Sequence, residues 1–240
     1  EGSERRLAVV DDEKGCVQVY NVESGECVAT IQSKKRLKQP GHLAYNGRGE
    51  LYVSDLGRAC IAVFDASGAY MRSLGENRSR ICGENDIIQP AGLAFTPEGH
   101  LVVADRWCDR VQVVREDGSY VRDFLSYGTG EGESGPLGEG TFARPTDVAV
   151  SSDGSVFVVD HGNKRVQVFD SSGVFVRSIG SRGDGAGQFQ KPNGITVGAD
   201  GEIIVADIQS DIERNDVQVF TREECTLRLL VAVARSISRR

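Results

Sequence analysis

The sequence VFVVD at residues 156–160 indicates the fold, because four close copies of it recur along the chain. The copies are LAVVD at 7–11, LYVSD at 51–55, LVVAD at 101–105 and IIVAD at 203–207. Taken in chain order, their final aspartates are spaced 44, 50, 55 and 47 residues apart. A β-branched phrase that returns at this period is typical of propeller blades, in which each repeat is one supersecondary unit.

Each repeat contains four short β-branched or alternating runs. In the third repeat these are GLAF at 92–95, LVVA at 101–104, VQVV at 111–114 and YVRDF at 120–124. Gly, Asp and Pro turns separate the runs, which is the signal of consecutive hairpins, and no stretch shows the period of a helix. The phrase Val-Gln-Val recurs in four repeats and places both valines on one face of a strand, as expected between neighbouring blades.

These observations predict an all-β protein, a β-propeller of four-stranded antiparallel blades with five recognisable units. The units span residues 5–32, 39–75, 89–125, 144–180 and 191–231. The first unit is incomplete, because Leu7 already belongs to the second-strand phrase. We therefore expect residues 1–240 to form a single domain that is an excised piece of a longer propeller. Irregular closure of the ring is the alternative.

The fourth and fifth units resemble the NHL repeat. The resemblance rests on DHGNKRVQVFD at 160–170, GSRGDGAGQF at 180–189 and PNGITV at 192–197. It extends over nearly the whole chain and implies an NHL-type propeller, usually of six blades. Such domains form the recognition end of TRIM-type ubiquitin ligases and also occur in bacterial sensor proteins and peptide-amidating lyases.

Composition and charge narrow the classes of partner. The chain has 240 residues, of which 39% are hydrophobic, and its 28 basic and 35 acidic side chains give a net charge of −7. The longest wholly apolar run, residues 229–234, is far shorter than the ~18 residues of a membrane helix, so we expect no membrane partner. An acidic chain also argues against general binding of polyanions.

The six cysteines show no zinc-binding spacing. They are Cys16, Cys27, Cys60, Cys82, Cys108 and Cys225. Because free cysteine packs as a small hydrophobe, we predict buried, reduced thiols and, with them, a cytoplasmic location. One N-x-S sequence at residues 77–79 points instead to a secreted protein.

The repeated aspartates are expected to be structural. Asp105 and Asp160 each stand five residues before an arginine, Arg110 and Arg165 respectively. Across a short hairpin loop this spacing allows a latch between the carboxylate, the guanidinium and the loop amides. The acidic loop at 207–216 lacks the glycine and the closing glutamate of an EF-hand, so it reads as a solvated loop.

No catalytic residue, metal ligand or cofactor is predicted. His42, His100 and His161 occupy three different positions of the repeat, which disfavours a zinc triad. A metal on the propeller axis, held by Asp147, Asn193 and His42, stays open as a weaker alternative.

The predicted binding residues lie on the face that carries the loops between second and third strands and the connections between blades. Trp107, the sole tryptophan, lies among guanidinium groups and suits peptide anchoring or base stacking. The full set is Arg58, Arg78, Arg80, Arg106, Trp107, His161, Asn163, Lys164 and Arg182.

The sequence favours a non-catalytic recognition module that binds a protein or peptide on this face. In a parent protein that resembles the TRIM ligases, it would select the substrate for ubiquitin transfer. RNA binding on the same face is the first alternative, and a metal-dependent lyase or hydrolase is the second.

Overall fold

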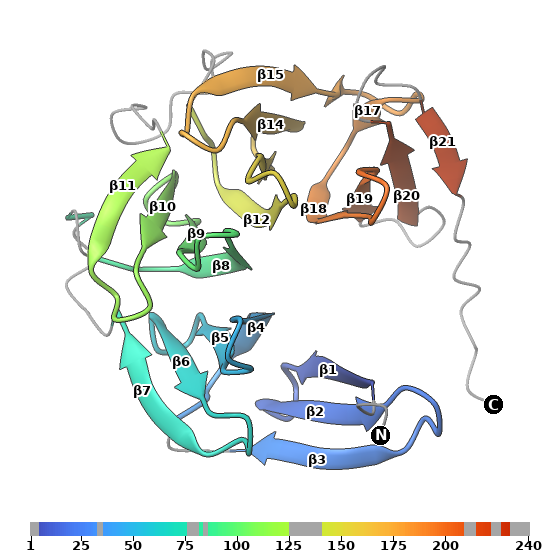
Figure 1. The fold of residues 1–240 in the computed structure, drawn as a ribbon. Coiled ribbons are helices and arrows are strands. Elements are labelled where there is room, and N and C mark those ends of the chain that lie inside the picture. The colour runs from blue at the N-terminus through green and yellow to red at the C-terminus, as the bar shows by residue number, and fades with distance from the viewer. Residues whose placement is uncertain are drawn as a thin grey trace. The chain divides into compact units, whose positions relative to one another are not determined.

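The computed structural model describes residues 5–32, 36–75, 82–83, 86–124, 141–208, 215–221 and 227–230. The chain divides into two compact units, which are described separately. Unit 1 comprises Glu1–Cys108 and Val113–Val121, and unit 2 comprises Asp109–Gln112 and Arg122–Arg240. All regular elements of the described residues are β-strands (Figure 1).

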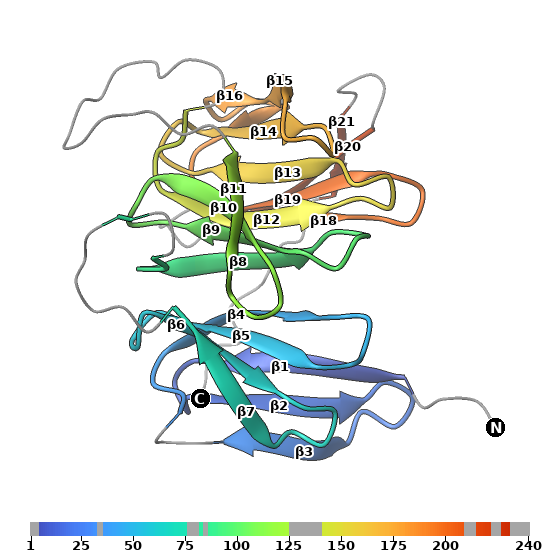
Figure 2. The ribbon, with the colours of Figure 1, turned by 60° about the vertical axis from the view of Figure 1, so that its left-hand side comes forward.

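Unit 1 begins with a sheet of three strands, in the order β1-β2-β3 (Figure 2). Its strands are β1 (Arg6–Asp11), β2 (Cys16–Asn21) and β3 (Cys27–Gln32). The second sheet has the order β4-β5-β6-β7, with β4 (Pro40–Tyr45), β5 (Leu51–Asp55), β6 (Cys60–Phe64) and β7 (Tyr70–Leu74). Consecutive strands in both sheets pair antiparallel, because short turns join them.

The boundary between the units passes through the third sheet. This sheet has the order β11-β10-β9-β8 and consists of β8 (Pro90–Phe95), β9 (Leu101–Asp105), β10 (Arg110–Val114) and β11 (Tyr120–Phe124).

Unit 2 contains two further sheets of four strands and one short pair. The fourth sheet comprises β12 (Pro145–Val150), β13 (Val156–Asp160), β14 (Arg165–Phe169) and β15 (Phe175–Ile179). The fifth comprises β18 (Pro192–Val197), β19 (Ile203–Ile208), β20 (Asn215–Phe220) and β21 (Leu227–Leu230). Between them, β16 (Ser181–Arg182) pairs in parallel with β17 (Gln188–Phe189).

The core of unit 2 lies between its two large sheets. Valines of the fourth sheet pack against the isoleucines and aromatic rings of the fifth in one buried cluster that includes Val159, Val166, Val168, Phe189, Ile203 and Phe220. In unit 1, equivalent clusters fill the space between the first and second sheets and between the second and third. Burial of these apolar faces is the main favourable contribution to folding.

The glutamine of the Val-Gln-Val sequence is buried in the third, fourth and fifth sheets. Gln167 is fully buried and its Nε2 donates to the Thr141 carbonyl at 2.7 Å. Gln218 donates from Nε2 to the Gln188 carbonyl at 2.7 Å and accepts from the Gly187 N–H at 3.0 Å. The one polar position of the strand therefore anchors the chain segment that leads into a sheet.

The predicted fold class is confirmed: the protein is all-β, with repeating antiparallel sheets of four strands and, among the described residues, a first sheet of three. A single domain over residues 1–240 stays a prediction. In the described part of the chain, no helix is long and apolar enough to cross a membrane.

Candidate binding rims

The repeated aspartates fasten the start of each four-stranded sheet. Asp55, Asp105 and Asp160 are completely buried, and Asp207 is 2% exposed. Each accepts hydrogen bonds from backbone N–H groups that precede the inner strand of its own sheet. The donors are Lys38 and Gln39 for Asp55, Ile88 and Gln89 for Asp105, Ala143 for Asp160, and Gln190 and Lys191 for Asp207, at 2.5 to 3.0 Å.

This arrangement places two kinds of segment side by side in each sheet: the residues before the inner strand and the loop after the second strand. We call this edge the loop rim. In unit 1 it comprises residues 38–42, 55–59, 88–92 and 105–108, and in unit 2 residues 143–147, 160–164, 182, 190–194 and 207–208.

The carboxylate of Asp160 is fully occupied. Its Oδ1 accepts from the Ala143 N–H at 2.8 Å. Its Oδ2 accepts from Asn163 Nδ2 and Arg165 Nε at 2.8 Å and from Gln167 Nε2 at 3.0 Å. A buried carboxylate with four donors has a structural role, since none of its oxygens is left for a substrate or a metal.

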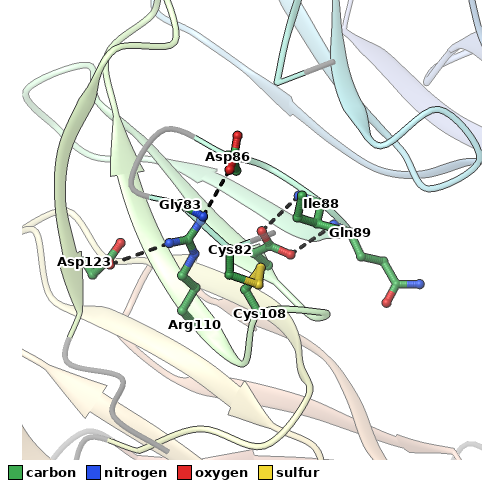
Figure 3. The surroundings of a disulfide bond; sticks show 9 residues. Cys82, Gly83, Asp86, Ile88, Gln89, Cys108, Arg110 and Asp123 are labelled. Atoms are coloured by element: carbon green, nitrogen blue, oxygen red, sulfur yellow. Dashed lines mark hydrogen bonds and ion pairs between the residues drawn. A yellow bond between two sulfur atoms is a disulfide. The ribbon is translucent and has the colours of Figure 1, made fainter. Parts of the chain in front are cut away.

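The two predicted arginine latches differ. Arg165 forms its ion pair with Asp160, whereas the Arg110 guanidinium lies 4.0 Å from Asp123 of β11 (Figure 3). Asp105 accepts the N–H groups of Ile88 and Gln89. Asp123 lies near Arg110 because β11 pairs with β10 in the sheet. The five-residue spacing between Asp105 and Arg110 does not reveal this neighbour.

In unit 1, the described members of the predicted binding set lie on two loops. Arg58 follows β5, and Arg106 and Trp107 follow β9. Trp107 is 52% exposed, so its ring is accessible at the rim. Arg78 and Arg80 lie outside the described residues.

The prediction of six buried thiols is wrong for three of the cysteines. Cys82 and Cys108 form a disulfide, their Cα atoms 5.7 Å apart although 26 positions separate them in the sequence (Figure 3). Cys27 is a free but exposed thiol, whereas Cys16 and Cys60 are buried and free as predicted. Cys225 lies outside the described residues. The pairing depends on two loops meeting in space, which spacing along the chain does not show.

In unit 2, the loop after β13 carries His161, Asn163 and Lys164. The Gly162 N–H donates to the Ala143 carbonyl at 2.8 Å, and His161 Nδ1 donates to the Pro192 carbonyl at 2.8 Å. A Cβ on Gly162 would lie 2.6 Å from that of Ala143, so this close approach requires glycine. The loop is thus held between the segments that lead into β12 and β18.

Four cationic side chains gather on this part of the rim: Arg144, Lys164, Arg182 and Lys191. Partial burial lowers the pKa of Lys164, and the positive charges of Arg144, Arg182 and Lys191 lower it further, against an opposing effect of Asp207. We call these four residues the basic cluster. Arg144 was not predicted as a binding residue. Its position before Pro145 matches that of Lys191 before Pro192. A comparison of the repeats could therefore have predicted Arg144 as a residue of the rim.

Two residues of the axial-metal alternative, Asp147 and His42, have structural partners. Asp147 is 4% exposed and accepts from the Ile195 N–H and the Val148 N–H, both at 2.8 Å. In unit 1, His42 Nδ1 accepts from the Leu93 N–H at 3.4 Å. Among the residues that the structure describes, no three His, Cys, Asp or Glu side chains gather as a metal site would require.

The sheets, their repeated latches and their loop rims define a β-propeller. A family model described as a 6-bladed beta-propeller matches residues 142–232. None of the curated proteins matches the chain.

Solved structures of several proteins resemble the fold. A virginiamycin B lyase from Staphylococcus aureus is 13% identical with a TM-score of 0.66, and the match covers 96% of this chain and 67% of the lyase. A gluconolactonase from Xanthomonas campestris is 17% identical with a TM-score of 0.69 and coverages of 96% and 73%. A chain of a nidogen/laminin complex is 16% identical with a TM-score of 0.70 and coverages of 93% and 74%. In a second structure of the S. aureus lyase, the match covers 66% of the lyase, so this chain spans slightly less than two thirds of its length. At these identities the similarity concerns the fold alone.

Proposed function

We propose that this chain is a recognition module that binds a protein or peptide through its loop rims. One observation carries the proposal: the aspartates that end the second strands of the four-stranded sheets are buried and accept hydrogen bonds, whereas cationic side chains and Trp107 reach the surface. Groups that are exposed at the rim are those that a ligand can contact.

The chemistry of these exposed groups suits binding. Arginine and tryptophan are enriched among residues that dominate interface energies, because each offers a flat, amphipathic surface. The loops that carry them are fastened to rigid sheets, which lowers the entropic cost of association. The similar chain in the nidogen/laminin complex is part of a protein assembly, and this supports the same class of role for the present fold.

In a longer protein of the TRIM ligase kind, the module would choose the substrate. The cytoplasmic location that such a role needs was predicted from reduced thiols. The Cys82–Cys108 disulfide removes part of that support, since disulfides persist mainly in oxidising compartments. The location therefore stays a prediction.

Capture from a cell lysate tests the proposal. The full chain, Trp107→Ala and Met71→Ala would be immobilised, with lysate applied before and after nuclease treatment. Met71 is the control because it is an exposed apolar residue of unit 1 that lies on the outer strand β7, away from the loop rim. We expect the wild-type chain to capture proteins from the lysate even after nuclease treatment. Trp107→Ala should no longer capture these proteins, and Met71→Ala should capture them as the wild type does.

Other outcomes would overturn the proposal. If nuclease treatment abolishes capture and the affinity falls steeply with salt concentration, the ligand is RNA instead. A divalent metal that co-purifies in stoichiometric amount would favour the metal-dependent lyase or hydrolase. Equal capture by Trp107→Ala and the wild type would remove Trp107 from the binding surface.

A further inference from the structure

The basic cluster of unit 2 is assembled by the backbone rather than by chance proximity of long side chains. The loop that carries Lys164 is bonded on one side to Ala143, the neighbour of Arg144, and on the other to Pro192, the neighbour of Lys191. Arg182 lies opposite Phe189 in the parallel β16–β17 pair, two residues before Lys191. Four separate segments therefore deliver one cation each to the same region.

Lys164 itself is held in an unusual conformation. Its φ is +58°, in the left-handed region, and Ala59 and Asp109 have positive φ at the equivalent position of the second and third sheets. The turn is thus a property of the repeat, and it presents the residue at this position from a fixed backbone. Lys164 is half-buried, so its ammonium group has lost part of its water.

The acidic residues nearby bind backbone or amide groups rather than the charged ends of the cluster. Asp160 and Asp207 are buried and accept backbone N–H groups, Asp109 Oδ1 accepts from the Arg144 N–H at 2.6 Å, and the exposed Asp184 accepts from Gln190 Nε2. Among the described residues, none of the four cationic side chains has a carboxylate within ion-pair distance. Gathering like charges without direct ion pairs is unfavourable, and an anionic ligand would relieve their repulsion.

We propose that Arg144, Lys164, Arg182 and Lys191 form a site for an acidic peptide, whose carboxylates they bind through charge-assisted hydrogen bonds. The inference rests on the proposed function and names the chemistry of its ligand. Guanidinium groups match carboxylates in a bidentate geometry, and the half-buried ammonium of Lys164 provides a point charge between them.

The surroundings favour peptide over RNA. Single-stranded RNA is bound by stacking bases on flat rings together with phosphate contacts. In the described part of the unit 2 rim, His161 is the one ring that reaches the surface, and its Nδ1 is bonded to the Pro192 carbonyl. The net charge of −7 also repels a long polyanion more than a short acidic segment.

Fluorescence anisotropy with a labelled hexaglutamate peptide tests this site on the full chain. The variants are Lys164→Gln and Arg182→Gln, and the control is Lys14→Gln. Lys14 lies in the corresponding loop of the first sheet but is paired with Asp11 at 2.8 Å, so this change alters net charge equally without touching the cluster. We expect Lys164→Gln and Arg182→Gln each to raise Kd about tenfold, the effect of one charge-assisted hydrogen bond, and Lys14→Gln to leave it unchanged.

A hexaglutamine peptide and a uridine hexanucleotide complete the design. Equal binding of hexaglutamine, or equal weakening by Lys14→Gln, would overturn the site. Tighter binding of the hexanucleotide, weakened by the same two variants, would assign the cluster to RNA. Absence of hexaglutamate binding by a chain that still captures protein through Trp107 would reject the acidic-peptide site and leave the proposed function intact.

Discussion

Replacing Asp160 by alanine should destabilise unit 2 more than any other single loss of a polar group discussed above. The carboxylate is completely buried and joins the segment before β12 to the loop after β13 and to β14. Its removal leaves the Ala143 N–H without an acceptor and the Arg165 charge without its counter-ion. Gln167 keeps its bond to the Thr141 carbonyl, so its loss is smaller.

The magnitude follows from these two groups. A buried donor that loses its partner costs about 1 to 3 kcal/mol, and breaking a buried ion pair costs about 3 to 5 kcal/mol. The Arg165 side chain is 15% exposed and regains some water, so we expect a total in the lower part of the sum, about 4 to 5 kcal/mol. Asp160→Asn should cost less, because its oxygen still accepts from Ala143 while its amide faces the other donors.

Native-state hydrogen exchange followed by mass spectrometry measures this locally. Peptides from β12 to β15 should lose protection in Asp160→Ala, and the free energy of opening should fall by the stated amount. The control is Asp11→Ala at the first repeat, where the aspartate pairs with Lys14 and is partly exposed. Equal losses in the two variants, or unchanged protection in Asp160→Ala, would refute the latch as the reason that the repeat keeps this residue type.

Three further predictions concern stability. Cys108→Ser should lower the free energy of unfolding by about 3 kcal/mol, because it opens a loop of 26 residues in the unfolded chain. Denaturant titration measures this loss. Alkylation of Cys82 and Cys108 in unreduced protein would contradict the disulfide. Val168→Asp should unfold unit 2, because it places an unpaired carboxylate at a core position that is 6% exposed. The control Val176→Asp changes a position that is 56% exposed and should give a near-normal melting curve by circular dichroism. Asp170 has a pKa lowered from 3.8, first by the Ser172 hydroxyl and then by the Val174 N–H, so its stabilising effect is complete above pH 3.8 and is lost as the pH falls through the lower folded value. Asp170→Asn should therefore show a smaller drop in Tm between neutral and acidic pH than the wild type, and an equal drop would remove Asp170 from the acid response.

Aligning the repeats predicts some residues of the candidate site and misses others. Placing His161 and Lys164 in the loop after a second strand needed only the alignment of the repeats. Arg144 was not predicted because it belongs to the segment before β12, 20 residues before Lys164 in the chain. The bond between Gly162 and Ala143 brings the two segments together. The partner of Arg110 escaped for a similar reason, since Asp123 lies on the neighbouring strand.

The sequence by itself determined the all-β class, the four-stranded repeat and the aspartate that ends each second strand. These features follow from local periodicity and turn chemistry, which neighbouring residues encode directly. Only the tertiary structure decided which cysteines pair, which carboxylate Arg110 meets and which cations share a surface. Those contacts join residues that are distant in the chain, and their distances depend on how strands register and sheets pack, which no local pattern specifies.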